Sequence, residues 1–448
     1  MSEARAGLRS LAHCPWRGCR PTLVNSAKQP KSMAMFHRRD FLTASAASLA
    51  APAVATSALA RPALGRGLAD VAVVGAGVFG AFAALALREN GHRVVSLDQY
   101  GPVSPRASSS GETRSIRSGY GDQAFYSAWS ARALTKWRAR EAEFGRKLLY
   151  PSARIELTDR WTDGMLAQRK IFDGLKLPYA IAGRDELRHR FPQMAFDDVE
   201  FAFVETAASS VLVKAREAVL ATIEAFEKKG GQSRFARATP GEAQGRRLLS
   251  LKLDGGDTLS AGSFVFAVGP WAGQLFPAIA HPRISVYRSE YLYYGTPAGD
   301  PRFSWPHQPL WHDHIRGGWG FGSIERGLKY SVAPGPRVDI DPDTADRMPR
   351  DALIKASRAY IAARFPALAG APILESRVCQ VDDARTTNFL VDRHPDFDNV
   401  FLAFAGGGHG FKHGPMVGDY VADLVGGRPL EPDAAQLFQL GAHPSMAV

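Results

Sequence analysis

The sequence predicts an α/β fold with a mixed sheet carrying helices, joined to a discontinuous second region built on a large antiparallel sheet. Two strongly apolar runs, residues 70–74 and 399–405, are each followed by a glycine-rich loop and a helical pattern. Between them, alternating runs at 284–294 and 317–323 are typical of antiparallel strands. A chain of 448 residues is long enough for two to three such domains.

The composition excludes several classes of protein. Charged residues at 22% and hydrophobic residues at 45% exclude a disordered, fibrous or disulfide-scaffold chain. The net charge is +11, but residues 1–60 hold eight basic and two acidic side chains, which leaves 47 basic against 42 acidic residues in the rest. No run of Lys or Arg exceeds two residues. We therefore expect no nucleic-acid partner.

Residues 33–60 resemble a twin-arginine export signal. The pair Arg38-Arg39 and the following Phe41-Leu42 precede an uncharged run rich in Ala and Ser, which ends in the small-x-small motif Ala58-Leu59-Ala60. A membrane-spanning helix is the alternative, but Ala and Ser transfer poorly into lipid and Pro52 interrupts the run. We expect transient contact with the export machinery, a periplasmic protein and no stable membrane insertion.

Residues 1–32 have no periodicity, and we expect them to be an upstream extension ahead of a start at Met33 or Met35. Removal of the signal would leave Cys379 as the last cysteine, so no intrachain disulfide is expected. Twin-arginine export carries proteins that are already folded. That route suits a chain that acquires a cofactor before it leaves the cytoplasm.

A complete βαβ unit begins the folded part. The strand at 70–74 leads into the loop Gly75-Ala76-Gly77-Val78-Phe79-Gly80, a helix follows at 81–89, and a second strand at 93–97 ends at Asp98. The glycines permit a tight turn, the approach of a pyrophosphate and close helix–strand packing, while Asp98 would accept the ribose hydroxyls. This Rossmann-like unit binds the ADP half that FAD and NAD share, so it does not separate them.

Two later loops favour a flavin. The small-residue loop at 108–117 carries Arg114 and Arg117, three residues apart, near the far end of the cofactor. The strand at 399–405 is followed by a glycine-rich loop with Lys412 and by a helix at about 415–425. That helix terminus could hold the negative charge of a reduced isoalloxazine. Taken singly, each of these cations could also be a solvated surface charge.

These motifs resemble the glycine/D-amino-acid oxidase family, most closely its monomeric sarcosine oxidase and N-methyltryptophan oxidase branch, over roughly residues 68–430. The segments 111–117 and 408–412 are similar to two flavin loops of that branch, and 266–271 resembles its strand that returns to the FAD domain. The resemblance implies an FAD-binding domain plus a substrate domain. The cofactor-binding residues that follow from it and from the βαβ unit are Gly75, Gly77, Gly80, Asp98, Ser110, Thr113, Arg114, Gly269, Cys379, Gly408, His409, Gly410, Phe411 and Lys412.

The resemblance also implies three roles in the chemistry. Cys379, ten residues before Phe389, matches the cysteine that anchors the flavin through a thioether at its 8α-carbon, although a buried free cysteine is the ordinary alternative. Lys329 matches the lysine that promotes oxygen reduction. Arg117 and Lys412 match the pair that holds the substrate carboxylate.

The chain departs from that branch at the amine end of the site. Ser110 and Ala333 stand where the sarcosine enzymes carry histidines, and Val381 replaces an aromatic residue. We therefore expect the substrate to be an amino acid with a secondary amine that is larger than sarcosine or differently shaped.

The expected domains are discontinuous. Residues 68–150, 205–280 and 368–430 form the FAD-binding domain, residues 151–204 and 281–367 form the substrate domain, and 431–448 is a tail. A crossover helix is expected at 213–229, and the start of an acidic helix at 339–350. His307, His312 and His314 lie close together without a Cys or carboxylate pattern, so no metal site is expected.

The expected activity is oxidation of a secondary or N-methyl α-amino acid to an imine, with O2 reduced to H2O2. The partners would be a small amine substrate and O2, and the protein would be a monomer. Two alternatives remain open: a dehydrogenase of the same fold that passes electrons to a quinone or carrier protein, and a binding protein that has lost its chemistry.

Overall fold

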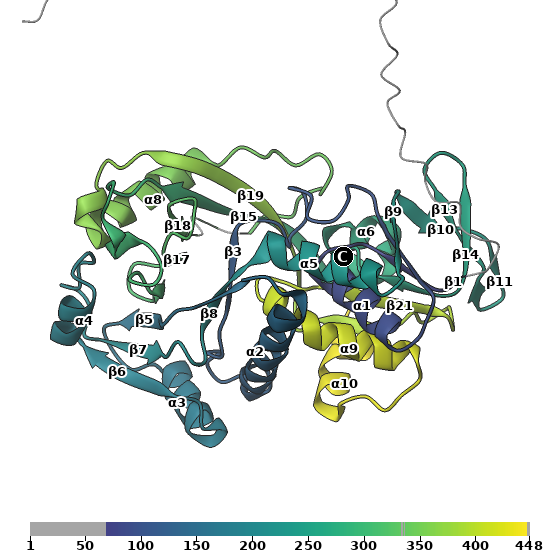
Figure 1. Ribbon diagram of the computed structural model, residues 1–448, viewed down its shortest axis with the longest axis horizontal. Coiled ribbons are helices and arrows are strands. Elements are labelled where there is room, and N and C mark those ends of the chain that lie inside the picture. Colours follow the sequence, from purple (N-terminus) through teal and green to yellow (C-terminus); the bar gives the residue numbers. More distant parts are fainter. Residues whose placement is uncertain (1–68, 333–334, 336, 446–448) are drawn as a thin grey trace, which may run out of the picture. The chain divides into compact units, whose positions relative to one another are not determined.

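The computed structural model describes residues 69–332, 335 and 337–445, all within one compact unit (Figure 1). The export signal, the upstream extension and Ala333 lie outside the described residues. Among the described residues, no helix has the length and apolar character needed to span a membrane.

The first sheet is mixed and has eight strands. At its centre β1 (Ala69–Val74) lies parallel to both β2 (Val94–Asp98) and β14 (Thr258–Phe266). Its other strands are β9 (Gln232–Phe235), β10 (Ala238–Pro240), β13 (Ser250–Leu253), β20 (Leu390–Arg393) and β21 (Val400–Phe404). This sheet has the Rossmann-like arrangement that the sequence predicts, since β1, β2, β14 and β21 are parallel, and β1, β2 and β21 are almost fully buried.

Both ends of the folded chain meet at this sheet. Helix α1 (Val78–Glu89) packs against α9 (Gly414–Val425), near the other end of the sequence (Figure 1). A Cβ on Gly418 would lie 2.6 Å from the backbone of Phe82, so only glycine allows this approach. The two glycine-rich loops that precede α1 and α9 are thereby brought together.

The second sheet also has eight strands, in the order β19-β15-β18-β17-β16-β5-β7-β6. Neighbours are antiparallel except β5 and β16, which are parallel. This is the large antiparallel sheet expected of the substrate region. Its strands are β5 (Arg154–Thr158), β6 (Tyr179–Gly183), β7 (Phe201–Glu205), β15 (Ile284–Tyr294), β16 (Leu310–Asp313), β17 (Trp319–Phe321), β18 (Leu328–Ser331) and β19 (Ile373–Ala384).

Strand β19 falls within the segment 368–430 assigned above to the FAD-binding domain, yet it pairs with β15 along its length, from Ile284 opposite Ala384 to Tyr294 opposite Ile373. The domain boundaries themselves stay a prediction. A third sheet joins β3 (Thr113–Ile116), β8 (Val211–Lys214) and β4 (Leu149–Pro151).

Two expected helices begin later than the sequence indicated. Residues 213–214 belong to strand β8, because this β-branched stretch pairs with β3, and helix α5 runs Ala215–Lys228. No helix forms at 339–350, where Pro342 and Pro349 disfavour one, and α8 runs Asp351–Arg364. The remaining α-helices are α2 (Ala124–Phe144), α3 (Asp163–Leu175), α4 (Arg184–Arg190), α6 (Ala272–Leu275), α7 (Pro277–Ala280) and α10 (Pro432–Phe438).

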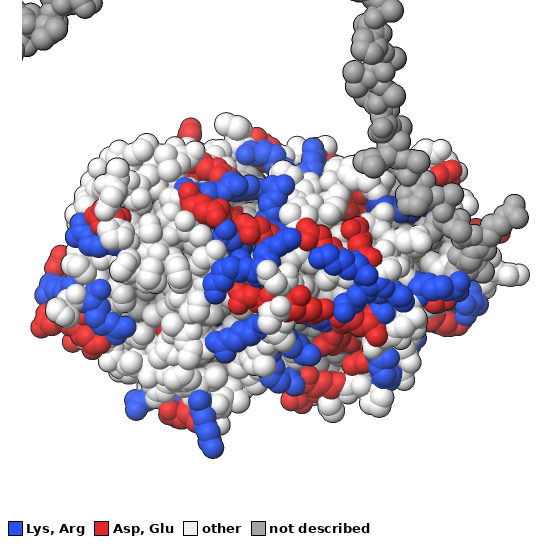
Figure 2. Space-filling model, in the orientation of Figure 1, with Lys and Arg blue, Asp and Glu red and all other residues white. Residues whose placement is uncertain are grey.

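The surface charges do not separate by sign on the face shown in Figure 2, where Lys and Arg side chains alternate with Asp and Glu. Many of them form ion pairs, such as that of Arg140 with Glu89 at 2.7 Å.

Candidate active site

A cavity of about 320 Å³ lies between the carboxyl ends of β1 and β2 in the first sheet and one face of the second sheet. Most of the predicted site residues line it: Gly75, Gly77, Asp98, Arg114, Arg117, Gly269, Cys379, Gly408, His409, Gly410, Phe411 and Lys412. Gly80, Ser110, Thr113 and Lys329 are not in the lining but contact residues that are. The fold therefore gathers the predicted residues from distant parts of the chain.

The first glycine loop brings the backbone to the cavity. Gly75 has a φ of 100°, and a Cβ there would overlap the carbonyl oxygen of Ala267. A Cβ on Gly80 would overlap the carbonyl oxygen of Gly75, so this glycine allows α1 to pack on the loop. Gly77, the N-cap of α1, offers no side-chain cap, and Ser109 Oγ accepts the N–H of Val78 at 2.9 Å, which leaves the next N–H groups of the first turn for an anion.

Asp98 stands at the end of β2, as expected for a residue that accepts ribose hydroxyls. Its carboxylate accepts the N–H groups of Ala76 at 2.8 Å and Tyr100 at 2.9 Å. Burial raises the pKa of Asp98, although these bonds act against the rise. The backbone bonds fix the carboxylate against the glycine loop.

The C-terminal loop is held by a carboxylate that the sequence analysis did not single out. Asp382 on β19 accepts the N–H of Ala405 at 2.8 Å through its side chain, and its carbonyl accepts the N–H of Gly407 at 2.9 Å. Both loop residues have a positive φ, 57° and 58°. Burial raises the pKa of Asp382 to about 7.

His409 and Phe411 are fixed by aromatic contacts. The ring of His409 stacks on Phe389 at 4.8 Å, and Phe411 stacks on Trp137 at 5.8 Å. Burial, and after it the charge of Lys412, lowers the pKa of His409 to about 3, so this imidazole is neutral at physiological pH.

Arg117 and Lys412 approach Tyr120 from two directions. The guanidinium of Arg117 donates to the carbonyl of Gly119, and its carbon lies 4.6 Å from the centre of the Tyr120 ring. Lys412 Nζ donates to Tyr120 Oη at 2.8 Å. Neither cation has a carboxylate partner in the described part of the chain. Burial, and after it neighbouring cations, lowers the pKa of both groups, so a bound anion would be favoured here.

Cys379 lies in a second cationic environment. Its Sγ is 3.4 Å from Tyr291 Oη and 3.6 Å from an Nη of Arg114. Burial acts to raise the pKa of the thiol, but the charge of Arg114 and the hydrogen bond from Tyr291 outweigh it and lower the pKa. A lowered pKa makes the nucleophilic thiolate form easier to reach.

Lys329 lies beside the same cluster. Its Nζ donates to the carbonyl of Thr113 at 3.0 Å and lies 4.0 Å from the centre of the Tyr291 ring. Burial, followed by the charge of Arg114, holds the pKa of Lys329 well below its usual range. An anion forming nearby would favour its protonated form.

One face of the second sheet orders these groups across the cavity. The strand pairing puts Lys329 opposite Phe321 and His312 opposite Trp319 and Glu156. Since side chains alternate along a strand, Arg154 shares the face of Glu156. From β19 to β5 the face therefore carries, in order, Cys379, Tyr291, Lys329, Phe321, His312 and Arg154.

Arg154 and Glu205 were missed in the sequence. Arg154 Nη1 donates to Glu205 at 2.7 Å and also to Glu156. The side chain of Glu205 is fully buried and accepts the N–H groups of Ser118 at 2.8 Å and Gly119 at 3.1 Å, so it fixes the loop directly after Arg117. Charged residues at alternate positions of a buried strand, such as Arg154 and Glu156, were the available signal.

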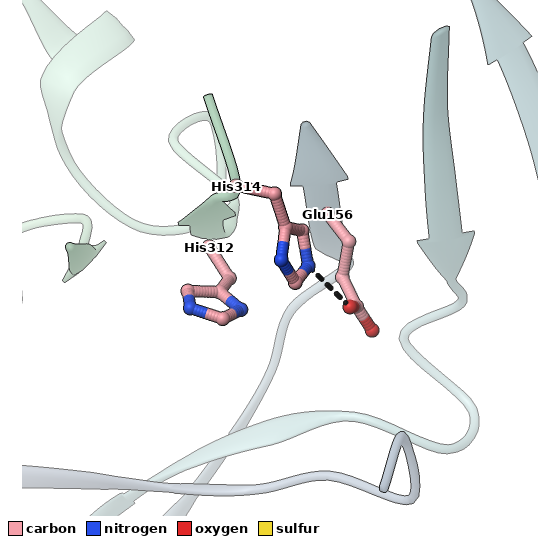
Figure 3. Close-up of side chains that lie close together, drawn as sticks. All are labelled: Glu156, His312 and His314. Atoms are coloured by element: carbon pink, nitrogen blue, oxygen red, sulfur yellow. Dashed lines mark hydrogen bonds and ion pairs between the residues drawn. The ribbon is translucent and has the colours of Figure 1, made fainter. Parts of the chain in front are cut away.

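Figure 3 shows a group that the sequence did not foresee. Glu156 supplies the carboxylate that His312 and His314 were expected to lack, because β5 lies next to β16, and His314 Nε2 is 3.0 Å from Glu156 Oε2. Burial, and then the charge of Arg154, lowers the pKa of His312 to about 3. The same positive surroundings oppose a divalent cation, and we assign no metal to this group.

Comparison with known proteins decides the family. The family model described as "FAD dependent oxidoreductase" (DAO) matches residues 70–424. The chain belongs to this family. It is therefore an FAD-dependent oxidoreductase of the kind that acts on C–N bonds of amines, as the sequence predicted.

Several relatives cover most of this DAO family member. The monomeric sarcosine oxidase of Streptomyces avermitilis is 30% identical over 80% of this chain and 93% of its own. The N-methyl-L-tryptophan oxidase of Yersinia pestis is 24% identical over 80% of this chain and 95% of its own. Among solved structures, the glycine oxidase of Geobacillus kaustophilus has a TM-score of 0.68 at 20% identity and covers 81% of this chain and 95% of its own. The last likeness confirms the fold.

The residues present fit FAD. The glycine cradle and the α1 terminus suit the pyrophosphate, and Asp98 suits the adenosine ribose. Arg114 and the loop before α9 lie where the cavity meets the second sheet, which suits the flavin ring. Sequence reasoning found these residues, and their individual roles stay predictions.

Proposed function

We propose that this DAO family member oxidises a secondary or N-methyl α-amino acid to an imine, with O2 reduced to H2O2. The observation that carries the proposal is the pair Arg117 and Lys412, two cavity-lining cations that have no carboxylate partner among the described residues. A substrate carboxylate is the anion that an arginine and a lysine would hold there. The names of the relatives, sarcosine oxidase and N-methyl-L-tryptophan oxidase, support an N-methyl amino acid.

FAD, when bound, takes up the two electrons of the substrate C–H bond and passes them to oxygen. The protein's part is to hold the substrate. Arg117 and Lys412 would fix the carboxylate, and Tyr120 keeps Lys412 in place through the bond from Nζ to Oη. Such positioning removes much of the entropic part of the barrier.

Anaerobic titration tests the amine chemistry. Addition of N-methyl amino acids to the purified yellow protein should bleach its flavin absorbance, and readmitted air should restore it with one peroxide per cycle. Recovery of the colour with an added quinone but not with oxygen would instead favour a dehydrogenase. No bleaching with any N-methyl or cyclic amino acid would contradict the proposal.

Lys329 would favour oxygen reduction by gaining positive charge as negative charge forms nearby. The support is its buried position beside Arg114, which makes its protonation sensitive to a nearby anion. In Lys329→Met, reoxidation should slow at least tenfold while anaerobic reduction stays within about twofold. Lys147→Met, at an exposed lysine, is the matched control. Equal loss in both half-reactions would contradict this role.

We also propose that Cys379 binds FAD covalently, supported by the lowered pKa of its thiol and its place in the cavity lining. The Cys379 thiolate would form a C–S bond with the 8α-carbon as that carbon loses a proton, and the two electrons released would reduce O2 to H2O2 with that proton and one more from the solvent. Denatured wild-type protein should precipitate yellow, whereas Cys379→Ser should release its flavin into the supernatant. A yellow precipitate from Cys379→Ser would contradict the linkage.

We further propose a monomeric, exported protein. The relatives named monomeric sarcosine oxidase support the monomer, and residues 33–60 support twin-arginine export. Replacing Arg38 and Arg39 together by Lys should retain the protein in the cytoplasmic fraction. An unchanged periplasmic fraction would contradict this route.

A further inference from the structure

The β5 end of the cavity holds an arginine with one edge left open. Both ion pairs of Arg154 use Nη1. Its Nε and Nη2 donate to no acceptor among the described residues, and neither atom is completely shielded from solvent. Because Arg154 lines the cavity, this free edge can meet a ligand, in the geometry that binds a carboxylate through two parallel hydrogen bonds.

Arg117 has a similar open edge close by. Only its Nη1 donates to a described residue, the carbonyl of Gly119. A Cβ on Gly119 would lie 2.8 Å from Arg154 Nη1, so the two guanidinium groups flank the same glycine. Arg117 and Lys412 together supply enough hydrogen-bond donors for one carboxylate. The free edge of Arg154 is therefore left over for a second acceptor.

His312 adds a polar group with no partner. Neither of its ring nitrogens forms a hydrogen bond with a described residue, and neither is completely shielded from solvent. The side chain lines the cavity. The groups that face it are Glu156 and Arg154 from β5, His314 just after its own strand, Trp319 from β17 and, farther off, Arg117. Cations dominate this set, so the imidazole is neutral until an anion arrives.

Counting charges shows what would balance the site. With a carboxylate bound between Arg117 and Lys412, both groups are charged, so that with Arg154 they contribute three positive charges, while Glu156 and Glu205 contribute two negative ones. One substrate carboxylate would neutralise the remainder. A second carboxylate would leave one negative charge, which His312 can offset by taking up a proton.

We infer, on the basis of the proposed function, that the substrate is a secondary α-amino acid with a second carboxylate in its side chain. Arg117 and Lys412 hold the α-carboxylate, and the open edge of Arg154 together with His312 binds the side-chain carboxylate. At about 4.8 Å per strand, His312 and Arg154 lie roughly 10 and 14 Å across the sheet from Lys329. Trp319 and Phe321 on β17 therefore separate Lys329 from both groups, whereas Arg154 lies close to Arg117 beside Gly119.

Binding of compounds that lack an amine tests the inference without turnover. Calorimetry on the FAD-containing protein should give glutarate, with two carboxylates, a Kd at least tenfold below that of glutaramate, in which an amide replaces one carboxylate. Glutarate binding should also take up about one proton, measured in two buffers of different ionisation enthalpy. Equal affinities, or binding without proton uptake, would overturn the inference.

Two variants locate the second carboxylate. His312→Gln breaks no hydrogen bond in the described structure, and Arg154→Lys keeps the charge but loses the fork. Each should raise the Kd of glutarate at least tenfold and change that of glutaramate by less than twofold, and His312→Gln should abolish the proton uptake. If Arg154→Lys weakens both compounds equally, Arg154 serves the same carboxylate as Arg117 and the inference fails.

The two proposals can fail separately. Anaerobic bleaching is compared between racemic N-methylglutamate and N-methylglutamine, which have nearly the same shape. Faster bleaching at lower concentration by N-methylglutamate supports the inference. Equal bleaching by both overturns the inference but leaves the proposed amine oxidation standing, and bleaching by no N-methyl amino acid overturns both.

Discussion

Asp382 should make the stability of the protein depend on pH in a way that Asn cannot reproduce. The carboxyl group is buried at the floor of the cavity, and this burial raises its pKa from 3.8 to about 7. A raised pKa means that the folded protein holds the proton more tightly than the unfolded chain does. The stabilisation is therefore complete below pH 3.8 and is lost as the pH rises through about 7.

The shift sets the size of the effect. About three pKa units correspond to about 4 kcal/mol, of which about 2 kcal/mol should disappear between pH 5.5 and 8.5. Asp382→Asn keeps an oxygen for the N–H of Ala405 but cannot ionise. The free energy of unfolding in urea, measured for both proteins at both pH values, should therefore fall about 2 kcal/mol further in the wild type. Other titrating groups cancel in the comparison, so an identical fall in the two proteins would contradict the raised pKa of Asp382.

Two other substitutions test the fold around the site. Gly75→Ala places a methyl group on the carbonyl of Ala267 and should prevent FAD incorporation, so that the purified variant is colourless, whereas Gly91→Ala, with a φ of 89° and open space around it, should keep the flavin at a cost of about 1–2 kcal/mol. Arg364→Met leaves the buried Asp313 without its partner at 2.8 Å and should cost about 3–5 kcal/mol in urea unfolding. Arg316→Met, at a more exposed ion pair, should cost about 1 kcal/mol or less, and equal losses would contradict this.

The parts of the site that the sequence revealed are local. The positions of Gly75, Gly77 and Asp98 could be predicted because they belong to one βαβ unit. Its strands, loop and helix are recognisable within about thirty consecutive residues. The loop at 406–412 was found in the same way, since an apolar strand precedes it and a helix follows. The two loops lie together because α1 packs against α9. The family resemblance implied that the loops meet, whereas the periodicity of the sequence did not.

The parts that the sequence missed depend on pairing between distant strands. Glu156 joins His312 because β5 lies parallel to β16, and no turn or short loop signals that partnership. Arg154 meets Glu205 across β5 and β7, and Asp382 reaches the loop at 405–407 from the end of a strand in the other sheet. These contacts bury charges that look like surface residues when the sequence is read alone.

The role of Arg117 and Lys412 in holding the substrate carboxylate is tested by comparing an acid with its amide. Stopped-flow mixing of the anaerobic protein with an N-methyl amino acid, and separately with its carboxamide, follows the loss of flavin absorbance. We expect rapid bleaching by the acid and at least hundredfold slower bleaching by the amide, because Arg117 and Lys412 hold a carboxylate. Bleaching of both at the same rate, or of neither, would contradict it.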